Sequence, residues 1–146
     1  AASDVYKRQA VQIPVIANGD ITSAEKAKQV LSYTGADAVM IGRAAQGKPW
    51  IFAELAARLQ NQAFNQPSLT EIHALVMQHL DNLYSFYGNV AGVRIARKHI
   101  AWYFDHLGGL SVANKTAIHQ AEQPAEQAAR VSLAFQELIP TYAYGN

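Results

Sequence analysis

Two short turns hold the residues best suited to bind a phosphate group. Asn18, Gly19 and Asp20 follow the apolar run IPVIA, and Gly42 and Arg43 follow the apolar run ADAVMI. Glycine lets an anion approach backbone amides closely, and arginine adds charge-assisted hydrogen bonds. A helix that begins after such a turn adds partial positive charge. Because the turns recur in consecutive strand–helix repeats, the sequence predicts one shared phosphate site.

The charged residues of these turns also allow simpler interpretations. Asp20 could instead cap the helix that follows it. Arg43 could be an ordinary ion-pair partner, although its place directly after a strand-end glycine favours a phosphate.

A second candidate site is a basic turn of helix in the segment VRIARKHIAWYF. Arg94, Arg97 and Lys98 stand at i, i+3 and i+4, so they share one helical face. They are three of the five Lys and Arg residues that follow residue 62. Such a local positive patch suits a phosphodiester backbone. A merely solvated helix face explains the same pattern equally well.

Histidines and aromatic residues surround this patch. His99 could contact a phosphate, stack on a base, or lie half-buried with its ring hydrogen-bonded. Trp102, Tyr103 and the aromatic residues of the segment YSFY, at 84–87, are expected in the core. The other histidines show no spacing with carboxylates that is typical of a metal site, so no metal is predicted.

The phosphate turns need a strand–helix–strand unit to position them. Near-continuous apolar runs before each turn predict strands buried on both faces of a parallel sheet. Thr22 with Glu25 predicts a capping box at the start of the intervening helix, and Gly35 predicts its left-handed end. A further helix is expected after Pro49.

The basic turn belongs to a different kind of structure. The polar segment NQAFNQPS predicts a domain boundary, and Ser68 with Glu71 predicts a capping box just after it. Apolar stripes then predict helices from residue 69 to Gly88, over 93–107, over 112–120 and over 124–139. The predicted organisation is an α/β part over residues 10–62 and a small helical bundle over 63–146.

Composition limits the classes of protein that fit. Half of the 146 residues are apolar, and none is cysteine. This chain therefore has no disulfide, thiolate metal site or cysteine nucleophile. Its apolar runs are too short to span a bilayer and no secretion signal is visible, so we expect a cytoplasmic monomer.

The first nine residues, AASDVYKRQ, have neither a hydrophobic period nor a turn signal. They match the translation of a sequencing adaptor used with transposases. Only two strands are visible, whereas a parallel sheet normally has more strands and cover on both faces. We therefore expect residues 1–9 to be an artefact without a role in the fold, and the gene to be cut inside a larger α/β domain.

Three segments together resemble the C-terminal half of bacterial tRNA-dihydrouridine synthases, with the B type most similar. They are IPVIANGDI, GADAVMIGRAAQGKPWIF and RIARKHIAWY, in this order and spacing. The resemblance implies the last two strand–helix units of an FMN-binding (β/α)8 TIM barrel, followed by a helical tRNA-binding domain.

The resemblance also implies roles for particular residues. Asn18, Gly19 and Asp20 would line the FMN site, and Gly42 with Arg43 would hold the FMN phosphate. The residues expected to meet tRNA are Arg94, Arg97, Lys98 and His99.

In this family NADPH reduces the flavin, which then gives a hydride to a D-loop uridine that has left its stack, forming 5,6-dihydrouridine. A cysteine supplies the proton, and this chain has none. We therefore expect the fragment alone to be inactive, and we assign no catalytic residue to this chain.

Two alternatives remain open from the sequence. One is another FMN-dependent TIM-barrel oxidoreductase, similar to dihydroorotate or dihydropyrimidine dehydrogenases, which would not need the helical domain. The other is a stand-alone helical RNA-binding module.

Overall fold

The computed structural model describes residues 10–143, with side chains through Leu138. Residues 1–9, for which an adaptor origin is predicted, lie outside the described residues. The chain divides into two compact units, Ala1–Gln66 and Pro67–Asn146. We call them unit 1 and unit 2.

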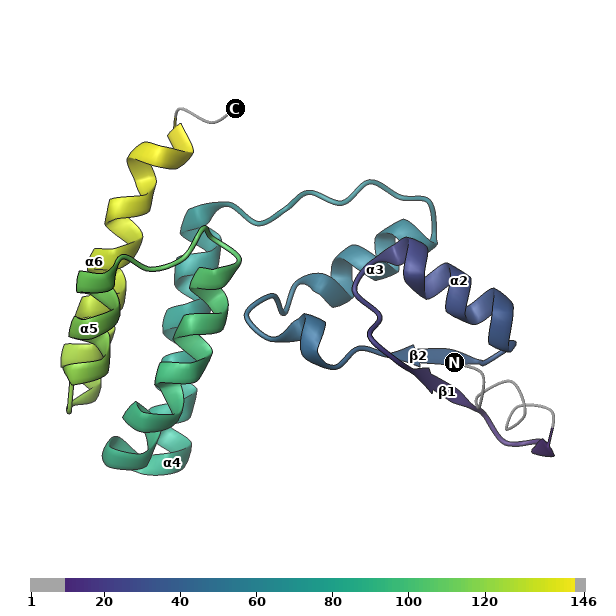
Figure 1. Cartoon of the computed structure of the whole chain (residues 1–146), viewed down its shortest axis with the longest axis horizontal. Helices are drawn as coiled ribbons and strands as arrows, with labels where there is room; N and C mark the ends of the chain where they lie inside the picture. The colour runs from purple at the N-terminus through teal and green to yellow at the C-terminus, as the bar shows by residue number, and fades with distance from the viewer. Residues whose placement is uncertain (1–9, 144–146) are drawn as a thin grey trace. The chain divides into compact units, whose positions relative to one another are not determined.

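Unit 1 is a strand–helix–strand arrangement followed by a short helical segment and a further helix (Figure 1). Its elements are β1 (Ile16–Asn18), α2 (Ala24–Thr34), β2 (Ala38–Met40), η1 (Arg43–Ala45) and α3 (Ile51–Leu59). The strands are parallel, with Ile16 opposite Ala38 and Asn18 opposite Met40. The carboxyl ends of both strands therefore lie next to each other.

The ends of α2 follow from local hydrogen bonding. Ser23 caps the first turn, because its side chain accepts a hydrogen bond from the backbone amide of Lys26. The predicted capping box from Thr22 to Glu25 is therefore wrong, since the helix begins one residue later. Gly35 ends α2 at φ 65°, and its amide donates to the carbonyl of Leu31, as predicted.

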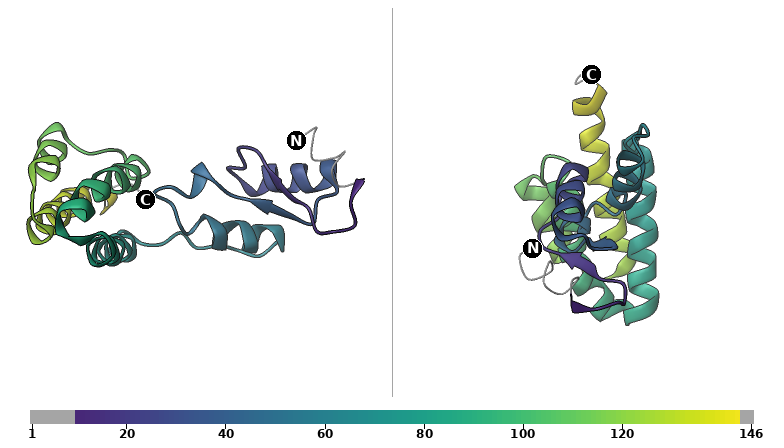
Figure 2. Two further views of the ribbon diagram at one scale, coloured as in Figure 1. Left: turned by 90° about the horizontal axis from the view of Figure 1, so that it is seen from below. Right: turned by 90° about the vertical axis from the view of Figure 1, so that its right-hand side faces the viewer.

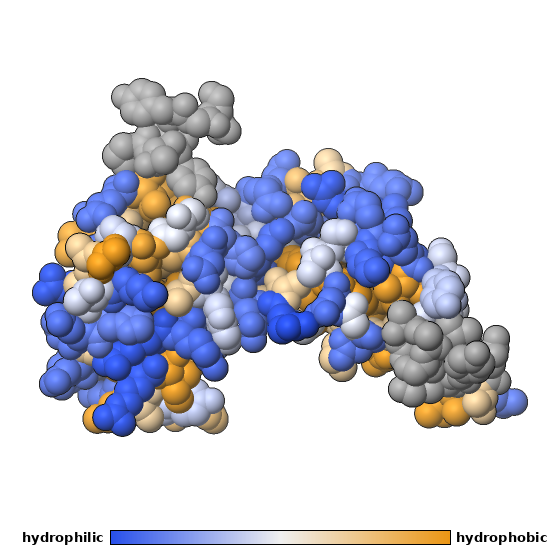
Figure 3. All heavy atoms as spheres, viewed as in Figure 1, coloured by the Kyte–Doolittle hydropathy of each residue, from blue (hydrophilic) through white to orange (hydrophobic). Residues whose placement is uncertain are grey.

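The core of unit 1 lies on one face of the two strands. Ala17 is fully buried against Ile21, Ala27 and Val30, and α3 packs beside α2 through Ile51 and Leu55, which contact Ala24. Other apolar residues of the strands and of the segment before them are exposed, namely Ile13, Ile16 and Met40. Figure 3 shows apolar surface on this side of the unit. The expectation of strands buried on both faces is therefore wrong for the described residues, because α2 and α3 cover one face.

Unit 2 consists of three helices, α4 (Leu69–Asp105), α5 (Val112–Gln120) and α6 (Pro124–Ala143). The predicted capping box at the start of α4 is present. Ser68 accepts from the Glu71 amide, and the Glu71 carboxylate accepts from the Ser68 amide at 2.8 Å. Helix α6 packs against both α4 and α5 (Figures 1 and 2).

Helix α4 is interrupted at Gly88, which has φ 75° and ψ 170°. The segments before and after this residue run antiparallel, because His79 lies beside His99 and Gly92 lies against Leu83 and Tyr84. The predicted end of a helix at Gly88 is confirmed.

The predicted apolar stripes of α4 form the core of unit 2. Phe104, Ile100, Leu80 and Val76 are among the largest fully buried side chains that α4 contributes to it. Helix α5 adds Ile118, and helix α6 adds Val131, Ala134 and Phe135.

Candidate functional site

The two predicted phosphate turns meet at the carboxyl ends of β1 and β2. Asn18 pairs with Met40 across the strands, so Gly19 and Asp20 leave the sheet beside Gly42 and Arg43. The guanidinium Nη2 of Arg43 forms an ion pair with the Asp20 carboxylate, and both side chains are largely exposed. The fold thus brings together charged residues that stand 23 positions apart in the sequence.

The backbone of these turns leaves room for a bound group. Gly19 has φ 149°, a value that favours glycine, and Asp20 also has a positive φ, of 44°. A Cβ atom added to Gly19 or Gly42 would meet no heavy atom within 4 Å. A phosphate group can therefore approach the backbone here without displacing a side chain.

This geometry bears on the roles predicted for Asp20 and Arg43. Asp20 does not cap α2, because Ser23 does, so the helix-cap interpretation of Asp20 is wrong. Arg43 is held by Asp20, as an ordinary ion-pair partner would be. An anion at this site would compete with the Asp20 carboxylate for the guanidinium hydrogen-bond donors.

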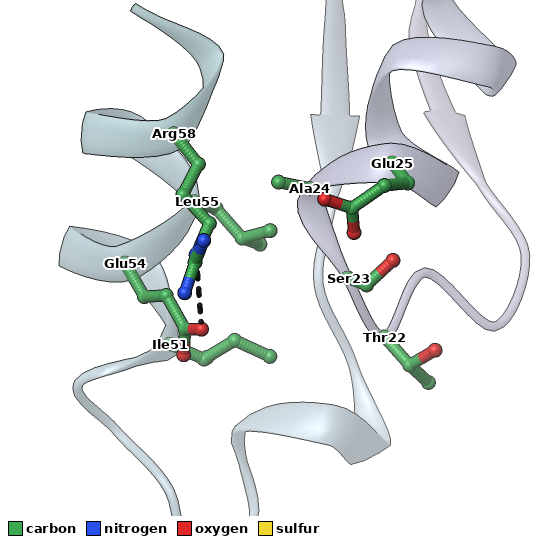
Figure 4. A pocket seen from close by; sticks show the side chains of 8 residues that line it. All are labelled: Thr22, Ser23, Ala24, Glu25, Ile51, Glu54, Leu55 and Arg58. Carbon is green, nitrogen blue, oxygen red and sulfur yellow. Dashed lines mark hydrogen bonds and ion pairs between the residues drawn. The ribbon is translucent and has the colours of Figure 1, made fainter. Parts of the chain in front are cut away.

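A separate hollow of about 270 Å³ lies between the start of α2 and helix α3, and contains none of the predicted site residues (Figure 4). Glu54 pairs there with Arg58 at 3.3 Å and, from outside the hollow, with Lys48 at 2.7 Å. The hydrogen bond from Lys48 is the main cause that lowers the pKa of Glu54. On the opposite side, hydrogen bonds from its own backbone and from Ser23 lower the pKa of Glu25. Both carboxylates are thus held in local pairs.

The predicted RNA-binding residues lie on the second segment of α4 but do not all face solvent. Arg94 and Lys98 are exposed. Arg97 is half-buried, and its Nη2 donates to the carbonyl of Ala121, at the end of α5, at 3.3 Å. Its Nε atom is buried without a hydrogen-bond partner. The outward positive charge of this turn therefore comes from two cations, one helical turn apart.

His99 belongs to a half-buried cluster between the two segments of α4. Its ring lies 4.9 Å from that of His79 and 5.1 Å from that of Trp102, between centroids. Burial lowers the pKa of His99, with smaller contributions from His79 and Lys98, and burial also lowers the pKa of His79. His79 Nδ1 lies 3.1 Å from the Tyr103 hydroxyl, and burial raises the pKa of Tyr103 to about 12. Both histidines therefore favour the neutral form at neutral pH and add little to the basic patch.

An exposed aromatic surface that the sequence pattern did not predict lies at the turn of α4. Phe86 is 81% exposed and Tyr87 is 48% exposed, so their predicted place in the core is wrong. They precede the Gly88 turn and lie beyond the crossing at Gly92. That position was the available signal, because residues at the tip of a helical hairpin have no facing helix. Trp102 is half-buried, with Lys98 Nζ 5.0 Å from its ring centroid.

Residues 10–143 offer little to other kinds of site. In this range no three His, Asp or Glu side chains converge as metal ligands would. None of the described helices combines the length and the apolar composition that crossing a membrane requires.

Comparison with known proteins adds a family match. The model of the family described as dihydrouridine synthase matches residues 4–139. A tRNA-dihydrouridine synthase B of Xanthomonas axonopodis pv. citri is 50% identical over 134 residues, which is 90% of this chain and 40% of the relative. A protein of the same name from Xanthomonas campestris is 51% identical over the same length. One from Vibrio vulnificus is 56% identical over 97 residues, which is 66% of this chain and 30% of the relative. The chain thus spans 40% of the length of the two Xanthomonas relatives.

Proposed function

Because the chain belongs to the dihydrouridine synthase family, we propose that it is the C-terminal part of an enzyme that reduces D-loop uridines of tRNA to 5,6-dihydrouridine. The observation that supports this most directly is the family match over residues 4–139, together with relatives named tRNA-dihydrouridine synthase B. Those names also favour a tRNA substrate over the free pyrimidines of other flavin barrels.

Unit 1 is, on this proposal, the last two strand–helix units of a (β/α)8 barrel. The parallel pairing of β1 with β2 is the arrangement that such a barrel requires. The exposed apolar side chains of Ile16 and Met40 are also consistent with it, because the interior of a complete barrel would cover strand residues of this kind. The family implies this architecture, and the two strands supply the matching part of it.

FMN is the cofactor that we propose for the complete enzyme. The turn residues fit its phosphate, since Gly19 and Gly42 leave the approach open and Arg43 presents exposed donors. Arg43 and the Gly42 backbone would hold the phosphate, whereas Asn18, Gly19 and Asp20 would line the adjoining part of the site. Asp20 would orient the Arg43 guanidinium through their ion pair. When bound, FMN supplies the two-electron reduction of the uracil ring, with NADPH as the reductant.

Unit 2 is, on this proposal, the tRNA-binding part. Arg94 and Lys98 would meet backbone phosphates directly, because both are exposed. Arg97 would act indirectly, because its hydrogen bond to the carbonyl of Ala121 holds α4 against the end of α5. His99 would contribute a neutral ring beside them. A tRNA substrate favours a cytoplasmic enzyme, for which we propose a monomer.

The test uses the full-length enzyme encoded by an intact gene, with residues numbered as in this chain. We expect NADPH-dependent formation of dihydrouridine in tRNA, measured by mass spectrometry of nuclease digests. Arg43→Gln should lower the affinity for FMN by about tenfold or more, because a hydrogen bond to a charged group contributes about 1.5–3 kcal/mol.

Arg58→Gln is the matched control, because it removes an arginine of unit 1 whose partner is Glu54 and not a turn residue. It should leave the flavin content unchanged. An unaltered full-length enzyme that forms no dihydrouridine would refute the proposed function.

A further inference from the structure

The second segment of α4 carries a stripe of three exposed side chains that ends at a half-buried aromatic residue. Val90, Arg94, Lys98 and Trp102 stand at successive i, i+4 positions, and we call them the α4 stripe. Val90 is 67% exposed, Arg94 and Lys98 are exposed, and Lys98 lies over the ring of Trp102. Residues four apart on a helix lie on the same side, so the stripe is continuous along the segment.

The stripe leads to two exposed aromatic residues at the end of the hairpin. Phe86 and Tyr87, which we call the tip aromatics, contact each other edge to face, with ring centroids 4.8 Å apart. Figure 3 shows apolar atoms within the hydrophilic surface at this end of α4. An aromatic ring as exposed as that of Phe86 gains nothing for the core, which points to a contact outside the unit.

An open hollow of about 550 Å³ joins Tyr87, one of the two tip aromatics, to the stripe. Tyr87, Asn89, Val90, Arg94 and Ile95 are among the residues that line it. Most of this lining is apolar, and Arg94 is the charged residue in it. The hollow thus offers apolar contact area, an amide side chain and one cation.

The charged residues around the hollow indicate which kind of partner it would bind. From Asn82 to Phe104 the sequence contains no Asp or Glu, although it contains Arg94, Arg97 and Lys98. A purely apolar partner would leave Arg94 buried without a counter-charge, which is costly. An anionic partner with flat apolar faces satisfies both the cation and the exposed rings. Single-stranded nucleic acid has these properties, because its bases stack on aromatic side chains and its phosphates pair with arginine.

We propose that the tip aromatics and Arg94 form a stacking site for an unpaired nucleotide of an RNA. The base stacks on Tyr87 within the hollow or on the adjoining ring of Phe86, and the neighbouring phosphate pairs with Arg94. Lys98 and Trp102 extend the contact along the α4 stripe. The inference rests on the proposed function in one respect, namely that the RNA is the tRNA substrate, whose loops hold unpaired nucleotides.

The experiment measures RNA affinity of the complete 146-residue chain by fluorescence anisotropy. One probe is a fluorescein-labelled RNA hairpin with an unpaired loop, and the other is the blunt duplex of the same stem. Phe86→Ala should weaken hairpin binding by about tenfold, since one base–aromatic stack contributes about 1–3 kcal/mol. It should leave duplex binding unchanged, because paired bases are not available to the ring. Arg94→Gln should weaken the binding of both probes.

Two substitutions serve as matched controls. Tyr33→Ala removes an aromatic residue of α2 that is 67% exposed, and Arg130→Gln removes an arginine of α6 that lies 3.9 Å from Glu126. Neither should change the affinity for the hairpin. Circular dichroism of each variant verifies that its helices are intact. Ultraviolet crosslinking of the unaltered chain to a hairpin with bromouridine in the loop should label Phe86 or Tyr87, independently of any variant.

Three results would overturn the inference. The first is an unchanged hairpin affinity of folded Phe86→Ala, and the second is crosslinking confined to residues outside 86–102. The third is a Phe86→Ala variant that loses self-association or binding to the upstream part of the enzyme, with RNA affinity unchanged, because the tip aromatics would then be a protein contact. None of these results bears on dihydrouridine formation by the full-length enzyme, which tests the proposed function separately.

Discussion

His79 and His99 face each other across the two segments of α4, and burial lowers the pKa of both rings. Lys98, Trp102 and Tyr103 lie around the two rings. A proton on either histidine would therefore lie in a half-buried place, and one on His99 would also lie near the Lys98 cation.

The first prediction concerns the pH dependence of stability. A histidine whose folded pKa lies below its unfolded value, near 6.5, binds protons more tightly when unfolded. Its contribution to stability is therefore present above about pH 6.5 and is lost as the pH falls through the folded pKa. The double variant His79→Gln/His99→Gln should lose less thermal stability between pH 7 and pH 5 than the unaltered chain. His119→Gln, an exposed histidine of α5, is the control, and equal pH dependence of all three proteins would contradict the prediction.

The second prediction concerns Gln127, a fully buried amide in the core of unit 2. Its Nε2 donates to the carbonyls of Val93 at 3.1 Å and Ile118 at 3.4 Å, and its Oε1 accepts from the Tyr84 hydroxyl at 2.8 Å. Gln127→Leu keeps the volume but leaves these groups unpaired, at a cost of about 1–3 kcal/mol. Urea denaturation should show this loss, whereas Gln123→Leu, an exposed position one turn earlier, should change little.

Individual side chains show where sequence reasoning stops at this scale. The spacing of Arg94, Arg97 and Lys98 predicts a shared face, but it contains no information on the carbonyl of Ala121 that Arg97 reaches. Asp20 and Arg43 were predicted as neighbours of one site because strand ends align, yet the ion pair between them depends on the register of β1 and β2. Contacts between distant segments decide both cases.

At the scale of elements, the α4 hairpin depends on two glycines that act differently. Gly88 adopts φ 75° and ψ 170°, which side chains rarely allow, and a Cβ there would meet nothing within 4 Å. Gly92 is helical, but its Cβ would lie 3.0 Å from the Leu83 carbonyl oxygen and 3.0 Å from the Tyr84 Cα. The first glycine permits the turn, and the second permits the close approach of the two segments.

The third prediction is that side chains at residue 92 destabilise unit 2 in order of size. Alanine gains about 1 kcal/mol of helix propensity over glycine. However, the alanine Cβ would push against backbone atoms of Leu83 and Tyr84, which costs about 1–3 kcal/mol of stability. Gly92→Ala should therefore be neutral to destabilising. Gly92→Val adds more bulk and should lose clearly more stability than Gly92→Ala in urea denaturation. Ser85→Ala, at an exposed neighbouring position, should stay within about 0.5 kcal/mol of the unaltered chain; a stabilised Gly92→Val would contradict the close contact.

Most element boundaries could be predicted, because short-range chemistry sets them. Ser68 with Glu71, Gly35 and Gly88 each mark an end through their own hydrogen bonds or backbone angles. The start of α2 was placed one residue early, since Thr22 and Ser23 are both good caps and the sequence does not decide between them. The exposure of Ile16 was missed, because an apolar strand does not reveal which of its faces a helix covers.

At the scale of the whole molecule, the two units differ in how far each completes its own core. Unit 2 buries apolar residues of all three of its described helices around Phe104 and Phe135. Unit 1 has two described strands of three residues each, with Ile16 and Met40 exposed. Two strands rarely form a stable sheet without further strands or cover.

The fourth prediction is that the units behave differently when they are expressed separately. Residues 67–146 should unfold cooperatively, with a midpoint close to that of the helical signal of the complete chain. Residues 10–66 should show no cooperative transition in the same circular dichroism measurement. A cooperative transition of residues 10–66 alone would show that the exposed strand face does not limit its stability.

Because the Arg97 side chain points inward to Ala121, fewer counterions should be released when RNA binds. Each phosphate that a protein cation neutralises on a single strand releases about 0.7 of a bound counterion. With Arg94 and Lys98 outward and Arg97 held by Ala121, the proposed RNA site would neutralise two phosphates along the α4 stripe. The logarithm of the RNA association constant should then fall with the logarithm of salt concentration with a slope of about −1.4 from this surface, and about −2.1 if all three cations took part. Arg97→Gln should consequently leave the slope unchanged, whereas Arg94→Gln should reduce its magnitude by about 0.7.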